Sequence, residues 1–146
     1  MTHSQPRLRS GFSLVELMIY MAVVGLLAMV VVPNFMSYLE TGRRSTTEQN
    51  LKAVKQAITT FYSDTGSYPD SLRELGTKPL DERTAKGWHG PYLEDGKMSE
   101  DGIPLDGWKH ELAYRKVDPS SGKAYELYSY GKGGEDGTDE DRIYAQ

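Results

Sequence analysis

The feature that most constrains this chain is an apolar run of 21 residues, Phe12 to Val32, in which Glu16 is the only charged residue. As a helix rising 1.5 Å per residue, the run spans about 30 Å, the thickness of the hydrocarbon core of a bilayer. A helix is expected because a segment that crosses lipid has to satisfy its own backbone hydrogen bonds. The leader, residues 1–10, carries two arginines and no acid, so we expect it to be cytoplasmic, with the chain after Pro33 on the far side of the membrane.

Two details distinguish this run from an ordinary membrane anchor. Glu16 lies one turn inside it, where a lone carboxylate costs about 2.5–3.5 kcal/mol on insertion scales and needs a partner. The small residue Gly11 precedes the run, whereas the cleavage site of a secretory signal peptide follows its apolar region. Cleavage after Gly11 removes only the basic leader and leaves a new amine at Phe12. The alternative is a single-span anchor whose Glu16 merely reaches toward the interface.

The stretch from Gly11 to Asn34, GFSLVELMIYMAVVGLLAMVVVPN, resembles the class III leader of type IV pilins and of the pseudopilins of type II secretion systems. The resemblance implies cleavage after Gly11 by a prepilin peptidase, which also methylates the amine of Phe12. It further implies self-assembly into a helical filament, in which Glu16 faces the terminal amine of a neighbouring subunit. The physics agrees, because a carboxylate that is costly alone is favourable beside a cation in a low dielectric.

Composition limits what the rest of the chain can be. With 146 residues there is room for one modest domain, and the absence of cysteine means that it holds together without disulfides. We therefore expect stabilisation by a structural metal or by neighbouring subunits. The net charge of −4 gives no basic surface for nucleic acid. Outside the leader the only histidines are His89 and His110, and there is no nucleophile-elbow motif, so we do not expect an enzyme.

Beyond Pro33, which should kink or locally melt the helix, the apolar spacing predicts that the helix resumes as an amphipathic half over residues 34–64. Its apolar positions form an early stripe and a later one: Phe35, Tyr38 and Leu39, then Leu51, Val54, Ala57, Ile58, Phe61 and Tyr62. Residues 42–50, polar on all sides, are expected to lie outside the core. Asp64-Thr65-Gly66 predicts the end of the helix, with Gly66 in the left-handed conformation.

The remaining residues, 65–146, predict a small loop-rich β region. A short helix is expected over Ser71–Gly76, and residues 77–104 are expected to form loops that Trp88 and Tyr92 attach to the core. Two strands, Glu111–Val117 and Lys123–Tyr130, should form a hairpin around the turn at residues 118–122. The predicted fold class is therefore α+β: a long N-terminal helix packed on a small antiparallel sheet, as in pilins.

The segment Gly131 to Asp141, GKGGEDGTDED, combines flexible glycines with five acids. One interpretation is a solvated acidic tail. The other is a calcium loop, because Ca²⁺ takes six to eight oxygens from carboxylates and carbonyls that a glycine-rich backbone can turn inward. The acids do not have the spacing of an EF-hand, and the residues alone leave both interpretations open.

Beyond the leader, the chain resembles the major pseudopilin of type II secretion systems. The resemblance rests on three stretches and on the chain's ending: Gly66-Ser67-Tyr68-Pro69, Gly90-Pro91-Tyr92-Leu93, Asp106-Gly107-Trp108, and Tyr128-Ser129-Tyr130-Gly131 followed by the acidic loop. It implies a subunit of a periplasmic pseudopilus, anchored by a single span in the bacterial inner membrane, with minor pseudopilins and inner-membrane platform proteins as partners. Trp108 is interpreted as core packing.

The resemblance also implies a calcium site in the acidic loop. The ligands that match are Asp139 and Asp141, with main-chain carbonyls near Tyr130 and Lys132. A family aspartate is replaced by Gly133, so that Asp136 has to substitute, the loop is shorter, and Arg142 separates the last acids from Ile143.

Two other functions remain open. A type IV pilin of a surface filament would share the leader, but most such pilins carry a disulfide-closed loop and this chain has no cysteine. A membrane-anchored domain of unrelated function is the other alternative. Neither the exported substrates, nor the filament symmetry, nor major as against minor subunit follows from the sequence.

Overall fold

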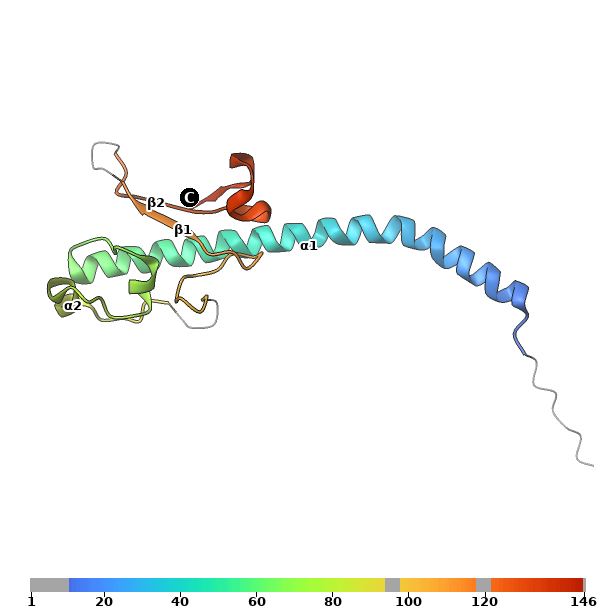
Figure 1. Cartoon of the computed structure of the whole chain (residues 1–146), viewed down its shortest axis with the longest axis horizontal. Helices are drawn as coiled ribbons and strands as arrows, with labels where there is room; N and C mark the ends of the chain where they lie inside the picture. The colour runs from blue at the N-terminus through green and yellow to red at the C-terminus, as the bar shows by residue number, and fades with distance from the viewer. Residues whose placement is uncertain (1–10, 94–97, 118–121, 146) are drawn as a thin grey trace, which may run out of the picture. The chain divides into compact units, whose positions relative to one another are not determined.

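The computed structural model describes residues 11–93, 98–117 and 122–145. Its elements, in chain order, are the long helix α1 (Leu14–Thr65), the 3-10 helix η1 (Leu72–Leu75), the short helix α2 (Glu82–Gly87), the strands β1 (Ala113–Lys116) and β2 (Tyr125–Ser129), the 3-10 helices η4 (Gly131–Asp136) and η5 (Asp139–Asp141), and the strand β3 (Ile143–Tyr144) (Figure 1). The predicted α+β class is confirmed. The leader, and all of the predicted hairpin turn except Gly122, lie outside the described residues.

The chain divides into two units, Met1–Leu39 and Glu40–Gln146. The first contains the N-terminal part of α1, and the second contains the rest of α1 with every other element. We predicted that the apolar half of the helix ends at Pro33 and that an amphipathic half follows. Pro33 lies six residues before the end of the first unit.

Helix α1 is 52 residues long and is helical through position 33, so the predicted local melting at Pro33 does not occur. A proline removes one amide donor, and the neighbouring hydrogen bonds of a long helix can continue around it. Asn34 Nδ2 also donates to the Val30 carbonyl at 3.1 Å. The predicted stop is confirmed: α1 ends at Thr65, and Gly66 follows with φ +74° and donates its amide to Tyr62.

The core of the second unit forms on the later apolar stripe of α1. Leu51, Val54, Ile58 and Phe61 are at most 2 % exposed, and Leu72, Leu75, Leu112, Leu127 and Ile143 pack in the same cluster. Spacing of three and four residues places the helix members on one face. Tyr62, predicted in this stripe, is 44 % exposed and stacks on Tyr68. The early stripe, Phe35, Tyr38 and Leu39, is exposed.

The sheet has three antiparallel strands in the order β1-β2-β3, and it lies along the C-terminal half of α1 (Figure 1). The predicted hairpin strands are confirmed but shorter than expected. Strand β3 was not predicted, because two residues are too few to show an alternating pattern. It pairs Tyr144 with Tyr128 and Ile143 with Ser129, which makes the edge of the predicted hairpin a central strand.

Two further expectations need correction. Residues 77–104 are not all loop, because Asp81 caps helix α2 by accepting a hydrogen bond from the Thr84 amide at 2.9 Å. Residues 42–50 do not all lie outside the core, since Thr47 and Asn50 are buried. The amide of Gly107 donates to the Thr47 hydroxyl, and Asn50 donates to the Leu105 carbonyl. A polar residue can be buried when a distant segment satisfies it, which a local pattern does not reveal.

The short helix predicted over Ser71–Gly76 is the 3-10 helix η1, and the predicted attachment of Trp88 and Tyr92 to the core is confirmed. Ser71 caps η1 by accepting from the Arg73 amide. Trp88 Nε1 donates to the Glu74 carbonyl at 2.9 Å, and the Tyr92 hydroxyl donates to Asp64 at 2.9 Å. Both aromatic rings, like that of Trp108, pack against the core cluster.

A buried carboxylate, Asp106, connects the segment before β1 to the sheet. It accepts hydrogen bonds from the Ser129 hydroxyl at 2.6 Å and from the amides of Trp108 and His110 at 2.8 and 2.9 Å. Its side chain is fully inaccessible to solvent. The neighbouring Gly107 allows this segment to reach α1, because a Cβ there would lie 2.1 Å from the Arg43 carbonyl oxygen.

Asp106→Ala should lower the free energy of unfolding by about 3 kcal/mol, because it leaves buried donors without an acceptor. Urea titration of the full chain in detergent, followed by the fluorescence of Trp88 and Trp108, measures the change within the second unit. Asp101→Ala is the control, since it removes only an exposed ion pair to Arg73 and should cost about 0.5 kcal/mol or less. Equal effects of the two substitutions would contradict the role of Asp106.

A chain that begins at Met36 should fold and remain monomeric without detergent. Every buried residue of the core cluster lies between Leu51 and Ile143, and most of the apolar surface of the first unit, from Phe12 to Phe35, is absent from this fragment. Light scattering after gel filtration measures its mass, and circular dichroism its melting. A fragment that is unfolded or aggregated would show that the second unit depends on residues 1–35.

Candidate assembly site and acidic loop

The N-terminal end of α1 leaves the predicted cleavage site accessible. The helix begins at Leu14, with its first hydrogen bond from the Leu17 amide to the Ser13 carbonyl. Gly11 and Phe12 precede the helix and are exposed. A peptide bond outside regular structure can enter a protease active site without unfolding a helix.

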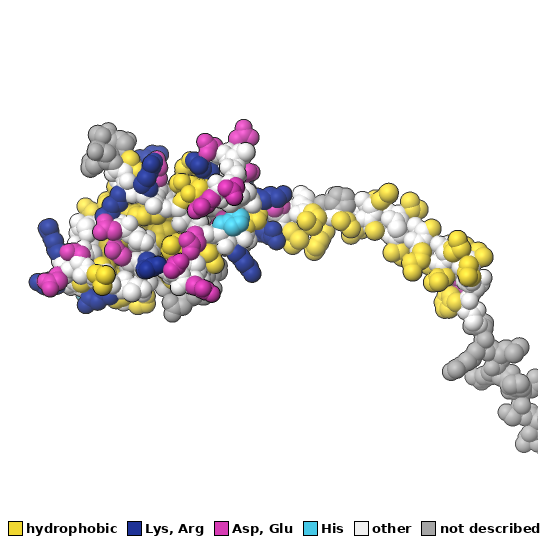
Figure 2. All heavy atoms as spheres, viewed as in Figure 1, with side chains coloured by type: hydrophobic (Ala, Val, Ile, Leu, Met, Phe, Trp, Pro, Cys, Tyr) yellow, Lys and Arg dark blue, Asp and Glu magenta, His cyan; other side chains and the backbone are white. Residues whose placement is uncertain are grey.

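The first unit exposes an unusual amount of apolar side chain. Large hydrophobic residues from Phe12 to Val32 are 49–77 % exposed, and Figure 2 shows them along this part of the helix. By length and composition α1 could cross a membrane, with a mean hydropathy of 2.5 over its most apolar window, none of which is buried within the protein. Such a surface requires lipid or other protein around it.

Within this surface, Glu16 has a polar partner. The Tyr20 hydroxyl donates a hydrogen bond to Oε1 of Glu16 at 2.9 Å. The ring of Phe12 meets the ring of Tyr20 edge-on, with centroids 6.1 Å apart. Glu16 and Tyr20 are four residues apart in the helix, which places them on one face. The predicted site residues Phe12 and Glu16 both contact Tyr20, which joins them.

Sequence reasoning did not identify Tyr20. The signal was available, because Tyr20 carries a hydrogen-bond donor inside the apolar run and lies one turn after the only acid in it. A carboxylate has about four acceptor positions, so one hydrogen bond from Tyr20 leaves room for a second donor such as an amine. The arrangement holds the carboxylate in place and can still accept a cation.

Strand alternation determines which residues face the acidic loop. In β2 and β3, Leu127, Ser129 and Ile143 point into the core and are at most 7 % exposed. The alternate residues therefore lie on the outer face of the sheet. Their rings touch: Tyr128 lies 5.3 Å from Tyr130 and 5.4 Å from Tyr144, centroid to centroid.

Arg142, from the same outer face, lies over this aromatic group. Its Cζ is 5.2 Å from the Tyr128 ring centroid and 5.8 Å from that of Tyr130. A hydrogen bond with the Tyr144 side chain, aided by the charge of Asp139, raises the pKa of Arg142. A hydrogen bond with Tyr128 and, next, burial raise the pKa of Tyr130. These directions keep the guanidinium charged and the tyrosine neutral.

The residues present fit a calcium ion poorly. Among the described residues, which include all the predicted ligands, no three acids or histidines gather into a group that could hold a metal. Asp139 is paired with Arg142 at 2.9 Å and is 85 % exposed. Asp141 accepts a hydrogen bond from Thr138 at 3.1 Å. Calcium binding through Tyr130, Lys132, Asp136, Asp139 and Asp141 stays a prediction that this geometry does not support.

Gly133 accounts for part of the poor fit. A Cβ on Gly133 would lie 3.5 Å from Oδ2 of Asp141. The aspartate found at this place in the family pattern would thus set a second carboxylate beside Asp141, and glycine supplies none.

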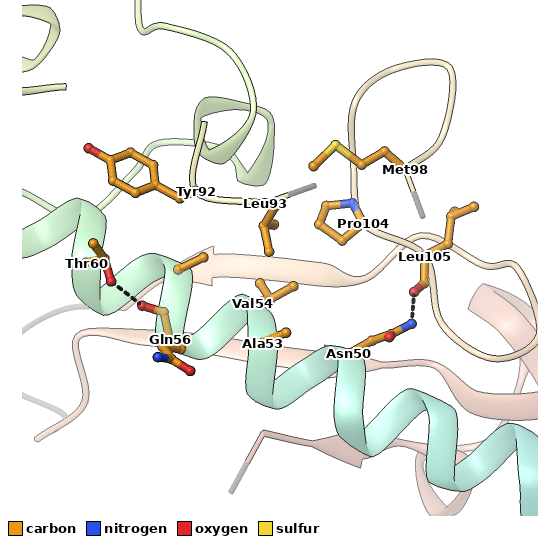
Figure 3. Close-up of a pocket in the computed structure, with 11 residues that line it drawn as sticks. Asn50, Ala53, Val54, Gln56, Thr60, Tyr92, Leu93, Met98, Pro104 and Leu105 are labelled. Atoms are coloured by element: carbon orange, nitrogen blue, oxygen red, sulfur yellow. Dashed lines mark hydrogen bonds between the residues drawn. The ribbon is translucent and has the colours of Figure 1, made fainter. Parts of the chain in front are cut away.

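A groove of about 640 Å³ lies beside α1 in the second unit (Figure 3). Its lining is mainly apolar, and Tyr92 is its one titratable side chain among the described residues. Burial raises the pKa of Tyr92. Asn50 lies at one end, where it donates to the Leu105 carbonyl at 2.8 Å. The described residues of its lining bring together no acid–base pair.

The long helix, its accessible N-terminal junction and the antiparallel sheet define a pilin-like protein. Two family models match accordingly: the prokaryotic N-terminal methylation motif over residues 6–32, and protein G of the type II secretion system (T2SS) over residues 34–145. The second match covers most of the chain. The chain belongs to the type II secretion system protein G family.

Individual relatives agree. The chain is 31 % identical to type II secretion system core protein G of Pseudomonas aeruginosa, over 91 % of this chain and 90 % of the relative. It is 30 % identical to the core protein G of Escherichia coli K12, over 90 % and 87 %. The crystal structure of the major pseudopilin from the type 2 secretion system of enterohaemorrhagic Escherichia coli has a similar fold, with a TM-score of 0.50 and 24 % identity, over 79 % of this chain and 96 % of that one.

Proposed function

We propose that this protein is a structural subunit of a periplasmic pseudopilus that serves protein export through a type II secretion system. The observation that carries the proposal is the match of protein G over residues 34–145, which spans nearly the whole second unit. The exposed apolar surface of the first unit supports it, because a filament core of packed helices would bury that surface.

In this proposal the subunit begins as a single-span protein of the inner membrane. The basic leader remains in the cytoplasm and the unit from Glu40 onward lies in the periplasm, as the two arginines and the lack of acids in the short leader favour. A prepilin peptidase cuts after Gly11 and methylates Phe12. Minor pseudopilins and inner-membrane platform proteins are the expected partners.

The chemistry of assembly would centre on Glu16. The new amine of one subunit approaches the carboxylate of its neighbour in a medium where an unpaired charge is costly. Tyr20 acts here as a positioning residue: its hydrogen bond keeps the carboxylate oriented before the amine arrives. The pair gives each subunit a fixed axial position relative to the next.

A surface pilus is the alternative. The type IV major pilin protein PilA of Myxococcus xanthus is 40 % identical, but over only 51 % of this chain and 33 % of that protein. The matches to core protein G cover about nine tenths of both chains. Because the matches to core protein G extend over the second unit, they favour a subunit of a secretion system over a subunit of a surface pilus.

Processing is the first prediction of this proposal. The native protein should have the mass of a chain that starts at Phe12 with one added methyl group, because Gly11 is small, exposed and outside the helix. Intact-mass spectrometry of protein purified from its own membrane measures this. Gly11→Arg should block the cut and leave the leader attached. A native chain that retains Met1 would contradict the processing step.

Glu16→Ala should reduce filament formation and export about tenfold or more while leaving the melting temperature of the second unit unchanged. A buried amine without its counter-charge costs about 3–5 kcal/mol, whereas one hydrogen bond to a charged group contributes about 1.5–3 kcal/mol. Tyr20→Phe should therefore show a smaller loss. Pelleted filaments and exported protein in the medium are measured by immunoblot.

Glu48→Ala is the matched control, because Glu48 is an exposed acid on the same helix that pairs only with Arg44 four residues earlier. It should assemble as the unmodified protein does. Normal assembly of the Glu16 variant would contradict the proposed charge pair.

A further inference from the structure

On the outer face of the sheet, tyrosine side chains surround the guanidinium of Arg142. Arg142 precedes the buried Ile143, and alternation along β3 places Arg142 on the same side as Tyr144. Tyr144 is paired with Tyr128 in the sheet register, and Tyr130 follows directly after the end of β2. The guanidinium lies over the rings of Tyr128 and Tyr130, and the Tyr128 ring also contacts that of Tyr144.

The same guanidinium reaches the acidic loop. Its Nη2 lies 2.9 Å from Oδ1 of Asp139, and the Arg142 side chain is 30 % exposed while that of Asp139 is 85 % exposed. A cation over an aromatic ring is attracted by the ring's negative face, and arginine can stack on one group while it hydrogen-bonds to another. An exposed ion pair alone contributes little to stability. Arg142 also packs on the tyrosine rings, so it attaches the loop to the sheet more firmly than its ion pair with Asp139 would alone.

The base of the loop is closed at the same place. Gly131 has φ +71°, and a Cβ there would lie 2.2 Å from the Asp141 carbonyl oxygen, so the two ends of the loop are in close backbone contact. The Gly131 amide donates to the Ser129 hydroxyl, and its carbonyl accepts from His110. Five acids and one lysine lie between these ends, which leaves an excess of negative charge to be neutralised.

We propose that the Arg142 guanidinium is the built-in cation of the acidic loop, tying residues 131–141 to the sheet so that the loop folds without a bound divalent ion. Position 133, where an acidic side chain would lie beside Asp141, is a glycine, and the carboxylate of Asp139 is turned toward Arg142. A covalently attached cation meets two needs that a metal would otherwise meet, since it offsets the acids and links both ends of the loop.

The proposal predicts that the loop is insensitive to calcium. The full chain in detergent, first treated with EDTA, should keep its melting temperature when millimolar calcium is added. A site filled at a hundred times its Kd would raise that temperature by about 10 °C in a domain of this size. Fluorescence of Trp88 and Trp108 follows the second unit.

The proposal also predicts a local effect of Arg142→Gln. A glutamate-specific protease should cut at Glu135 and Glu140 about five- to thirtyfold faster than in the unmodified chain, because loss of the tether raises the population of the open loop. Arg115→Gln is the matched control: Arg115 is also ion-paired on this sheet, at 2.7 Å, but to Glu126 of β2 and not to an acid of the loop. Mass spectrometry of the fragments identifies the sites cut.

Two results would overturn the proposal. One is a rise of several degrees in the melting temperature with calcium that EDTA reverses. The other is cleavage at Glu135 and Glu140 that is no faster in Arg142→Gln than in Arg115→Gln. Both measurements are independent of filament assembly, so they are unaffected by the outcome of the export experiments.

Discussion

The second unit depends on one buried carboxylate for its internal alignment. Burial of the α1 stripe supplies most of the driving force, but apolar contact is non-directional and would tolerate small shifts of the sheet. Asp106 removes that freedom, because its three donors come from Ser129 in β2 and from the segment before β1. The adjacent amide of Gly107 then bonds to Thr47 of α1.

The same network extends to the acidic loop. Ser129 gives its proton to Asp106 and accepts the amide of Gly131, whose carbonyl contacts His110. Helix, sheet and loop are thereby joined through a few fixed polar atoms. In a chain without cysteine, such directional bonds perform the alignment that a disulfide provides in many small secreted domains.

Much of the candidate assembly site could be located from the sequence, because its chemistry is local. An acid in an apolar run and a small residue before it have few explanations, and the spacing of Leu51, Val54, Ile58 and Phe61 determines the buried face of α1 whatever packs on it. Burial of Thr47 and Asn50 could not be predicted, since their partners lie 55–60 residues away. Tyr20 was missed because a tyrosine is ordinary in an apolar segment until its hydroxyl partner is considered.

The acidic loop shows that amino-acid composition is a poor guide to a metal site where many charged residues lie close together in the sequence. Five acids suggest a metal, yet one of them, Asp139, pairs with Arg142, which lies outside the core beside the buried Ile143. A one-residue slip of β3 would turn Ile143 to solvent and Arg142 into the core. Burial of Ile143 therefore holds the cation over Tyr128, so the hydrophobic core determines indirectly how the acidic loop is neutralised. Because arginine stays protonated at every physiological pH, this neutralisation does not depend on the ions in the surrounding solution.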